Sequence, residues 1–281
     1  MDSEYFDELD KELGESLSIG EYCLFALKKA NALVDGKFAS GRKASRTMYA
    51  EQAFGRYYPQ EIKEYSRIID KFTGMCDDIN DDTMDREERA LYMAALANNI
   101  SLTLDNFPPE ILKEFSTHIK KMLYIQTAEY LTLSDMSRNN EREKIIESGI
   151  KNYTARAIDM DVFIRLPALV LVKRENVDVG KLVKAGRNFR AVNLLHKDFR
   201  DIPHDVRNGT LTPVIALQKK DINVRVFTQK LMELLEDSFR NIETSIQSEA
   251  EEYIIHNLHE MSYKEYEAAK EIAELYSSPV V

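Results

Sequence analysis

The chain has 281 residues, of which 44% are hydrophobic and 31% charged, a balance typical of a globular protein with a sizeable buried core. Its net charge is −10, from 38 Lys and Arg against 48 Asp and Glu, which argues against a nucleic-acid partner because such proteins usually present a basic surface. Two cysteines make neither a disulfide framework nor a four-thiolate zinc site, and this indicates a cytoplasmic location.

The expected elements are helices. The acidic start, MDSEYFDELDKELGES, does not resemble a leader, and no stretch approaches the ~20 apolar residues of a membrane span. Apolar residues recur at spacings of three and four, which predicts an all-α protein. Breaks are expected at turn-forming residues, namely 35–36, 38–41, 58–59, 105–109, 139–140, 176–180 and 202–203. None of them has the composition of a linker, so we expect a single domain over residues 1–281.

The first acidic cluster is DDINDD at residues 77–82. A helix turns by ~100° per residue, so Asp77 and Asp81 lie side by side, with Asp78 on a neighbouring strip. Carboxylates at this spacing repel one another, which makes a bound divalent cation a sensible compensation. In isolation, such a run is more often a solvated charged surface.

A second acidic cluster strengthens the metal hypothesis. Asp198, Asp201 and Asp205 are spaced i, i+3 and i+7, so they share one helix face within ~60°. Magnesium prefers oxygen ligands, usually takes one or two carboxylates, and completes its shell with water and substrate phosphate. Two such clusters therefore predict magnesium bound to a diphosphate, where the ions help to ionise the bond between the diphosphate and an allylic carbon.

The order of the motifs resembles the trans-isoprenyl diphosphate synthases of the class I isoprenoid (terpenoid) synthase superfamily, most clearly over residues 36–220. Residues 77–81 resemble the family's first aspartate-rich motif, and IQTAEYL at 125–131 resembles its Gly-Gln-x-x-Asp-Leu segment. KDFRD at 197–201 resembles the second aspartate-rich motif, with Lys197 in place of its first Asp. Residues 208–217 resemble the Gly-x-x-Thr-Leu-Pro-type stretch that follows in long-chain polyprenyl synthases.

This resemblance implies an antiparallel helical bundle of the class I isoprenoid synthase type around a deep apolar pocket, in a homodimer. It implies magnesium, with manganese as its substitute, bound by Asp77, Asp78, Asp81, Asp198, Asp201 and Asp205. Four of these would be catalytic, namely Asp77, Asp81, Asp198 and Asp201. The implied diphosphate-binding residues are Arg46, Arg86, Lys151, Arg156 and Lys197, and the implied pocket residues are Phe72, Thr73, Gln126 and Thr154.

Departures from the family pattern concentrate on the site for isopentenyl diphosphate. Asp70 falls where the family has a histidine, and Glu87 where it has the second of two paired arginines. Two added acids would repel a diphosphate. We therefore expect a magnesium-dependent prenyltransferase or isoprenoid synthase that ionises an allylic prenyl diphosphate and releases diphosphate, with an acceptor site atypical for isopentenyl diphosphate.

Other functions remain open. The spacing of the second cluster also occurs in terpene synthases, which favours a cyclase or lyase, and DIPHD at 201–205 resembles the Asp-x-x-x-Asp repeat of squalene and phytoene synthases. A third alternative is a non-catalytic partner subunit of a prenyl synthase. The expected partner is a prenyl diphosphate substrate, with transient membrane contact in the case of a long-chain product.

Overall fold

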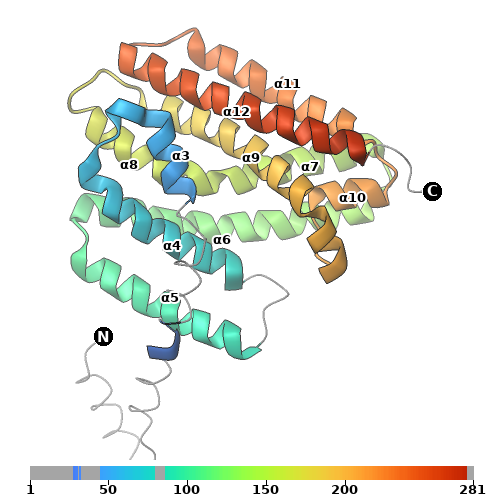
Figure 1. Ribbon diagram of the computed structural model, residues 1–281, viewed down its shortest axis with the longest axis horizontal. Helices are drawn as coiled ribbons and strands as arrows, with labels where there is room; N and C mark the ends of the chain where they lie inside the picture. Colours follow the sequence, from blue (N-terminus) through green and yellow to red (C-terminus); the bar gives the residue numbers. More distant parts are fainter. Residues whose placement is uncertain (1–27, 31, 33–44, 80–85, 277–281) are drawn as a thin grey trace, which may run out of the picture. The chain divides into compact units, whose positions relative to one another are not determined.

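The computed structural model describes residues 28–30, 32, 45–79 and 86–276 (Figure 1). Every regular element in this part of the chain is a helix, which confirms the all-α prediction. No helix among the described residues is both long enough and apolar enough to cross a membrane. The chain divides into two compact units, Met1–Met48 with Lys63–Phe115 and Tyr49–Ile62 with Ser116–Val281. The expectation of a single domain stays a prediction.

The predicted breaks can be compared with the helix ends. In chain order the helices are α3 (Ser45–Phe54), η1 (Gly55–Tyr57), η2 (Gln60–Ile62), α4 (Lys63–Ile79), α5 (Arg86–Asn106), α6 (Pro109–Arg138), α7 (Arg142–Arg156), η3 (Ala157–Met160), α8 (Asp161–Leu171), α9 (Val179–Asn208), α10 (Pro213–Lys219), α11 (Val224–Glu243) and α12 (Glu249–Leu275). The gaps between them coincide with the breaks expected at 58–59, 105–109, 139–140 and 176–180. Those expected at 35–36 and 38–41 lie outside the described residues.

The break expected at residues 202–203 is wrong, because α9 continues through Pro203 to Asn208. Proline cannot donate the backbone hydrogen bond of its turn, which normally ends or kinks a helix. Here Phe199 and Ile202, which precede it, are buried and hold the helix against the core. Tertiary packing therefore outweighs the local signal at this position.

The first unit is built on α4 and α5, which pack against each other. Apolar residues recur every three or four positions along α4 and form one side of the helix. On this side Ile69, Phe72 and Met75 are buried. Phe72 meets Phe115 edge to face, with the ring centroids 5.1 Å apart. The acidic residues 77–78 thus follow the buried residues of α4 in the last turn of the same helix.

The second unit is organised around α9, which packs against α7, α8, α10, α11 and α12 (Figure 1). Gly186 permits a close crossing with α8, since a Cβ atom built on it would lie 2.5 Å from Cγ1 of Ile164. Asp178 caps the start of α9, since its carboxylate accepts hydrogen bonds from the backbone N–H groups of Gly180 and Lys181. Gly209 caps its end, with a φ of 71° in the left-handed conformation that glycine favours.

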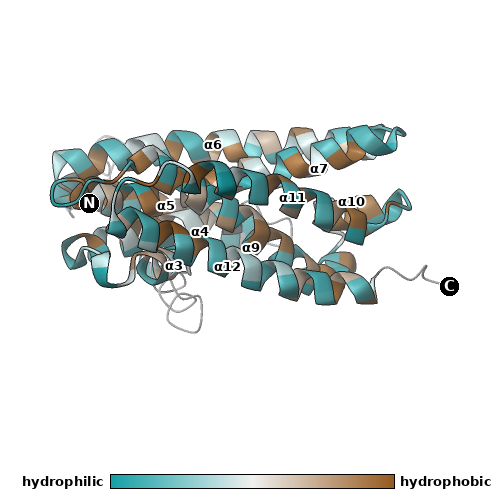
Figure 2. Ribbon diagram, turned by 90° about the horizontal axis from the view of Figure 1, so that it is seen from above, coloured by the Kyte–Doolittle hydropathy of each residue, from teal (hydrophilic) through white to brown (hydrophobic). Residues whose placement is uncertain are grey.

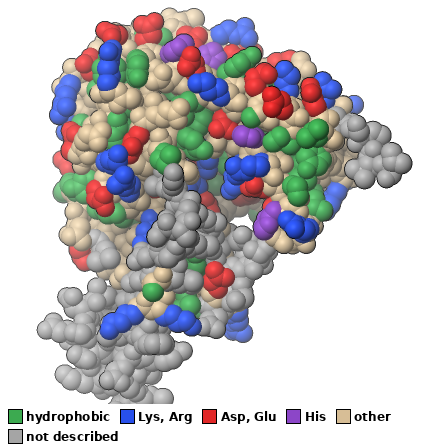
Figure 3. All heavy atoms as spheres, viewed as in Figure 1, with side chains coloured by type: hydrophobic (Ala, Val, Ile, Leu, Met, Phe, Trp, Pro, Cys, Tyr) green, Lys and Arg blue, Asp and Glu red, His purple; other side chains and the backbone are tan. Residues whose placement is uncertain are grey.

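Parts of the surface of the second unit are strongly polar. Figure 2 shows mostly hydrophilic residues on the upper sides of α11 and α12. In the view of Figure 3, acidic and basic side chains are interspersed over this part of the molecule. The charged side chains visible in Figure 3 therefore form no patch of a single sign over this part of the molecule.

Candidate functional site

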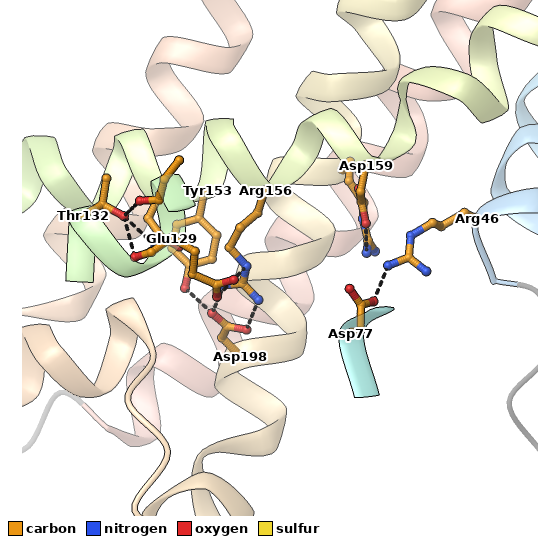
Figure 4. A network of polar contacts seen from close by, with 11 residues as sticks. Arg46, Asp77, Glu129, Thr132, Tyr153, Arg156, Asp159 and Asp198 are labelled. Carbon is orange, nitrogen blue, oxygen red and sulfur yellow. Dashed lines mark hydrogen bonds and ion pairs between the residues drawn. The ribbon is translucent and has the colours of Figure 1, made fainter. Parts of the chain in front are cut away.

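The first acidic cluster lies at the end of α4 in the first unit. Asp77 and Asp78 occupy the last turn of the helix, whereas Asp81 lies outside the described residues. Arg46 donates a hydrogen bond of 2.6 Å from Nη2 to Oδ2 of Asp77 (Figure 4) and one of 3.3 Å from Nη1 to Oδ1 of Asp70. One predicted diphosphate-binding cation is thus shared between a predicted metal ligand and a second acid.

Asp70 holds Arg46 inside the unit, and its expected repulsion of a diphosphate stays a prediction. Its Oδ2 also accepts a 2.8 Å hydrogen bond from the backbone N–H of Thr47. Burial raises the pKa of the Asp70 carboxyl, and the charge of Arg46 and the Thr47 N–H only partly offset this rise. Burial, together with Asp77, also raises the pKa of the Cys76 thiol to about 12, so this thiol is not an activated nucleophile.

Three other predicted residues of the first unit lie on α4 and α5. Phe72 and Thr73 are both buried in α4, and the Thr73 hydroxyl donates a 2.8 Å hydrogen bond to the carbonyl of Ile69. Arg86 is the first residue of α5, and its side chain is exposed. The role of Phe72 and Thr73 as lining residues of a pocket stays a prediction.

The second acidic cluster lies on α9 in the second unit. Asp198 is buried, while Asp201 and Asp205 are half-buried. Arg200 donates a 3.1 Å hydrogen bond from Nε to Oδ1 of Asp201. The pKa of Asp205 is raised by its burial and by the neighbouring carboxylates of Asp198 and Asp201. One helix face therefore gathers three acids whose charges act on one another, as the spacing predicts.

Asp198 is held by two side chains of α7 (Figure 4). Its Oδ2 accepts hydrogen bonds of 2.9 Å from the Tyr153 hydroxyl and 2.7 Å from Nη1 of Arg156. Its Oδ1 accepts a longer bond of 3.2 Å from Nη2 of Arg156. Nε of Arg156 lies 3.4 Å from Oε1 of Glu129 on α6. Arg156 thus joins carboxylates of two different helices.

The surroundings of Arg156 and Tyr153 shift the pKa values of both side chains. Burial lowers the pKa of Arg156, but Asp198 and Glu129 outweigh burial and raise it well above its usual value. Burial and the adjacent Asp198 raise the pKa of Tyr153, which keeps its hydroxyl protonated and able to donate. Since both Asp198 oxygens are engaged, the more accessible carboxylate oxygens of this face belong to Asp201 and Asp205.

The remaining predicted residues of the second unit lie on α6, α7 and α9. Gln126 and Thr154 are half-buried, and the Thr154 hydroxyl donates a 3.0 Å hydrogen bond to the Ile150 carbonyl of its own helix. Lys151 and Lys197 are exposed. Lys197 nevertheless acts on the acidic cluster, since its charge lowers the pKa of Asp205 and so offsets part of its rise, while Arg156 forms hydrogen bonds with Asp198.

Two further buried aspartates were not predicted. Asp159 receives Arg190, with Nη2 2.8 Å from Oδ2 and Nε 3.0 Å from Oδ1. The same guanidinium donates a 2.6 Å bond to the amide oxygen of Asn193, and the amide nitrogen of Asn193 donates a 3.2 Å bond to the Tyr49 hydroxyl. This chain of contacts links α3, η3 and α9 within the second unit.

Asp161 forms the other unpredicted pair. Arg187 donates to it from Nε, at 2.6 Å, and from Nη2, at 2.5 Å, and Lys121 forms an ion pair with the same carboxylate. The sequence carries a signal for both aspartates, since they interrupt the apolar stretch AIDMDVFI at 157–164, and buried acids are usually paired. It does not indicate which cations pair with them, because these come from other helices.

The donor set of the second cluster suits a hard cation. Among the residues that the structure describes, no three His, Cys, Asp or Glu side chains are arranged as a metal-binding group. Magnesium often takes only one or two carboxylates and fills its shell with water and phosphate oxygens, so two half-buried aspartates are a sufficient protein contribution. Asp201 and Asp205 meet this requirement on one face of α9.

Comparisons with known proteins add no relative. No family model matches the chain, and searches of curated proteins and of solved structures found no match. The function must therefore be inferred from the motifs and from the contacts of their residues.

Proposed function

We propose that this chain is a magnesium-dependent class I isoprenoid synthase that ionises an allylic prenyl diphosphate and releases diphosphate. The observation that carries the proposal is the carboxylate face of α9, where Asp198, Asp201 and Asp205 act on one another and Asp198 holds the guanidinium of Arg156 in place. The order of the sequence motifs supports the same reaction. In this proposal the helices form an antiparallel bundle around a deep apolar pocket that receives the prenyl chain.

Asp201 and Asp205 would hold magnesium in the second unit, and Asp77 with Asp81 would do so in the first. Magnesium, when bound, supplies a Lewis acid that neutralises negative charge on the leaving diphosphate. The residues fit this role because their oxygen donors match a hard cation, and because a cation would relieve the repulsion that contributes to the raised pKa of Asp205.

Arg156 would bind the diphosphate, and Asp198 would position Arg156. The Nε and both Nη atoms of Arg156 face carboxylates, but each Nη carries a second N–H group that can donate to a phosphate oxygen. Because Asp198 and the Tyr153 hydroxyl are buried behind it, the guanidinium is oriented before a substrate arrives. A fixed cation of this kind stabilises charge as it develops on the leaving group.

The test is incubation of the full chain with magnesium and allylic diphosphates of increasing chain length, with and without isopentenyl diphosphate. We expect magnesium-dependent diphosphate release, and a loss of roughly 100-fold or more for Asp201→Asn, the range found when one group that stabilises transition-state charge is removed. Asp237→Asn, an exposed aspartate of α11, is the matched control and should leave the rate unchanged. Release from none of the substrates would refute catalysis, while product masses separate elongation, cyclisation and condensation.

A second candidate function is that of a non-catalytic partner of a prenyl synthase. It is favoured by the ion pairs Arg46–Asp77 and Arg156–Asp198, in which a predicted diphosphate-binding cation neutralises a predicted metal ligand. Under this function the chain alone releases no diphosphate, and Arg156→Ala lowers only the stability of the fold. The release assay therefore decides between the two candidates.

A further inference from the structure

A cluster of three charged side chains in the second unit takes no part in the proposed reaction. Asp161 on α8 has only 1% of its side chain exposed, and it contacts Arg187 on α9 and Lys121 on α6. Arg187 and Lys121 both reach the surface, with 42% and 30% of their side chains exposed. Two cations beside one carboxylate leave a net charge of +1, and the accessible part of the cluster is cationic.

The guanidinium of Arg187 uses one of its two forked edges. Nε lies 2.6 Å from Oδ1 of Asp161 and Nη2 lies 2.5 Å from Oδ2, the bidentate arrangement of an arginine and a carboxylate. A guanidinium has five N–H donors, so both donors of Nη1 and the second donor of Nη2 have no partner among the described residues. These donors form the other edge, which can bind a second anion.

Lys121 brings a second cation to the same carboxylate oxygen. Its Nζ donates to Oδ2 of Asp161, the oxygen that also accepts from Nη2 of Arg187. The two nitrogens are therefore no more than about 6 Å apart, since neither hydrogen bond exceeds ~3 Å. An ammonium group has three N–H donors, which leaves two of them for another acceptor. A single anion can thus contact both cations.

The fold holds these two cations in place. Asp161 is the first residue of α8, and Arg187 directly follows Gly186, where α8 and α9 cross closely. The hydrogen bond from Arg187 to Asp161 raises the pKa of the guanidinium further, so its charge is permanent. A second cation beside an aspartate that is already paired repels the first cation, and a bound anion would offset this repulsion.

We propose that Arg187 and Lys121 form a binding site for a phosphate group, separate from the acidic face of α9. A phosphate group carries three acceptor oxygens that point in different directions, so it can bind the open guanidinium edge and the ammonium group together. A carboxylate has two oxygens, and the guanidinium edge alone would engage both. The ligand is therefore free phosphate or a small phosphate monoester.

This site is independent of the proposed reaction. Arg187 precedes Asp198 by roughly 16 Å along α9, at 1.5 Å per residue. Neither cation belongs to the acidic clusters or to the predicted diphosphate-binding residues. The inference therefore stands whether or not the chain is an isoprenoid synthase.

Titration of the full chain with inorganic phosphate, followed by phosphorus NMR in the presence of a chelator, tests the site. Lys121→Met leaves Asp161 paired with Arg187, and it should weaken phosphate binding by roughly 10-fold or more because a charge-assisted hydrogen bond is lost. Lys120→Met, an exposed position on the same helix, is the matched control and should change the dissociation constant by less than about 2-fold. Because no magnesium is present, the outcome does not depend on the release assay.

Conservative variants separate geometry from charge. Lys121→Arg keeps the cation and should bind phosphate within about 3-fold of the wild type, whereas Arg187→Lys keeps the charge but loses the open bidentate edge and should weaken binding by roughly 10-fold. Circular dichroism should show an unchanged fold for each variant, because Asp161 keeps a cationic partner in all of them. Absence of binding to the wild type, or equal losses in Lys120→Met and Lys121→Met, would overturn the proposal.

Parallel titrations with glycerol 3-phosphate and acetate identify the class of ligand. If the ester binds as tightly as inorganic phosphate and is equally weakened by Lys121→Met, the site takes a phosphorylated small molecule. Weaker binding of the ester assigns the site to free phosphate. Acetate should bind at least roughly 10-fold more weakly at the same ionic strength, because it cannot contact both cations. Acetate binding as tight as that of phosphate would contradict the assignment to a phosphate group.

Discussion

Asp70 and Asp198 are both buried acids that accept hydrogen bonds from an arginine, yet their surroundings differ. Asp198 receives the guanidinium of Arg156 through both oxygens and the Tyr153 hydroxyl as well. Asp70 receives one nitrogen of Arg46, whose other Nη is committed to Asp77, and one backbone N–H. Fewer donors and a shared cation leave the ionised form of Asp70 poorly compensated, which is why burial dominates its raised pKa.

The raised pKa of Asp70 predicts an unusual pH dependence. Because its folded-state pKa lies above the unfolded value, the folded protein takes up this proton first as the pH falls. The wild type should therefore gain stability relative to Asp70→Asn as the pH falls from the raised pKa of the folded state toward the ordinary carboxyl pKa of the unfolded chain. Urea denaturation of both proteins across this range measures the difference. A wild type that becomes less stable relative to Asp70→Asn as the pH falls would contradict the prediction.

At the scale of elements, α9 shows which features of a helix can be predicted from sequence patterns. Its limits are encoded locally, since Asp178 caps its start and Gly209 supplies the left-handed residue at its end. Its acidic face also follows from helical spacing alone, because one period fixes where Asp198, Asp201 and Asp205 lie relative to one another. Pro203 is the local signal that misled, because burial of the residues before it decides the outcome.

The partners of the acidic face could not be predicted in the same way. Arg156 and Asp198 are separated by 42 residues and belong to different helices, so no spacing within one helix places them together. The contact of Tyr153 with Asp198 was equally unpredictable, because only the packing of α7 on α9 brings its hydroxyl to this carboxylate. Sequence analysis therefore identified the carboxylates and Arg156 separately, and the fold supplies their contact.

The crossing of α8 and α9 predicts the effect of Gly186→Ala. Alanine has a higher helix propensity than glycine by ~1 kcal/mol, which would stabilise an isolated helix. At this crossing the added methyl would lie 2.5 Å from Cγ1 of Ile164, a fully buried side chain. Overpacking costs about 1–3 kcal/mol, so we expect a net loss of stability in urea denaturation.

The control for Gly186→Ala is Lys184→Ala on an exposed position of the same helix, where the free energy of unfolding should change by less than ~0.5 kcal/mol. If Gly186→Ala instead stabilised the protein by about the propensity difference, the helices would cross at a greater distance than the structure gives.

At the scale of the whole molecule, the net charge of −10 conceals a balanced interior in the second unit. Three buried aspartates are each matched by cations, namely Asp159 by Arg190, Asp161 by Arg187 and Lys121, and Asp198 by Arg156. Asp201 and Asp205 add further negative charge beside this set. A summed field of this kind favours the arrival of a cation at the exposed end of the acidic face.

This charge excess predicts opposite effects of the same substitutions with and without ligand. Without ligand, Asp201→Asn combined with Asp205→Asn should raise the melting temperature, because it removes the repulsion that contributes to the raised pKa of Asp205. With magnesium and inorganic diphosphate, the wild type should gain about 2.7 kcal/mol at 100 times the dissociation constant, or roughly 5 °C, and the double variant should lose this gain.

Differential scanning fluorimetry measures both effects on the full chain, with Asp237→Asn as the control that should respond to ligand as the wild type does. Asp77→Asn is the informative further variant, since the resemblance to isoprenoid synthases predicts a reduced ligand response for it as well. The double variant should melt at a higher temperature than the wild type without ligand and gain less from ligand. A general loss of structure would lower the melting temperature in both conditions, so it cannot imitate this result. A double variant that keeps the full ligand-induced rise would show that the acidic face of α9 does not bind the magnesium–diphosphate complex.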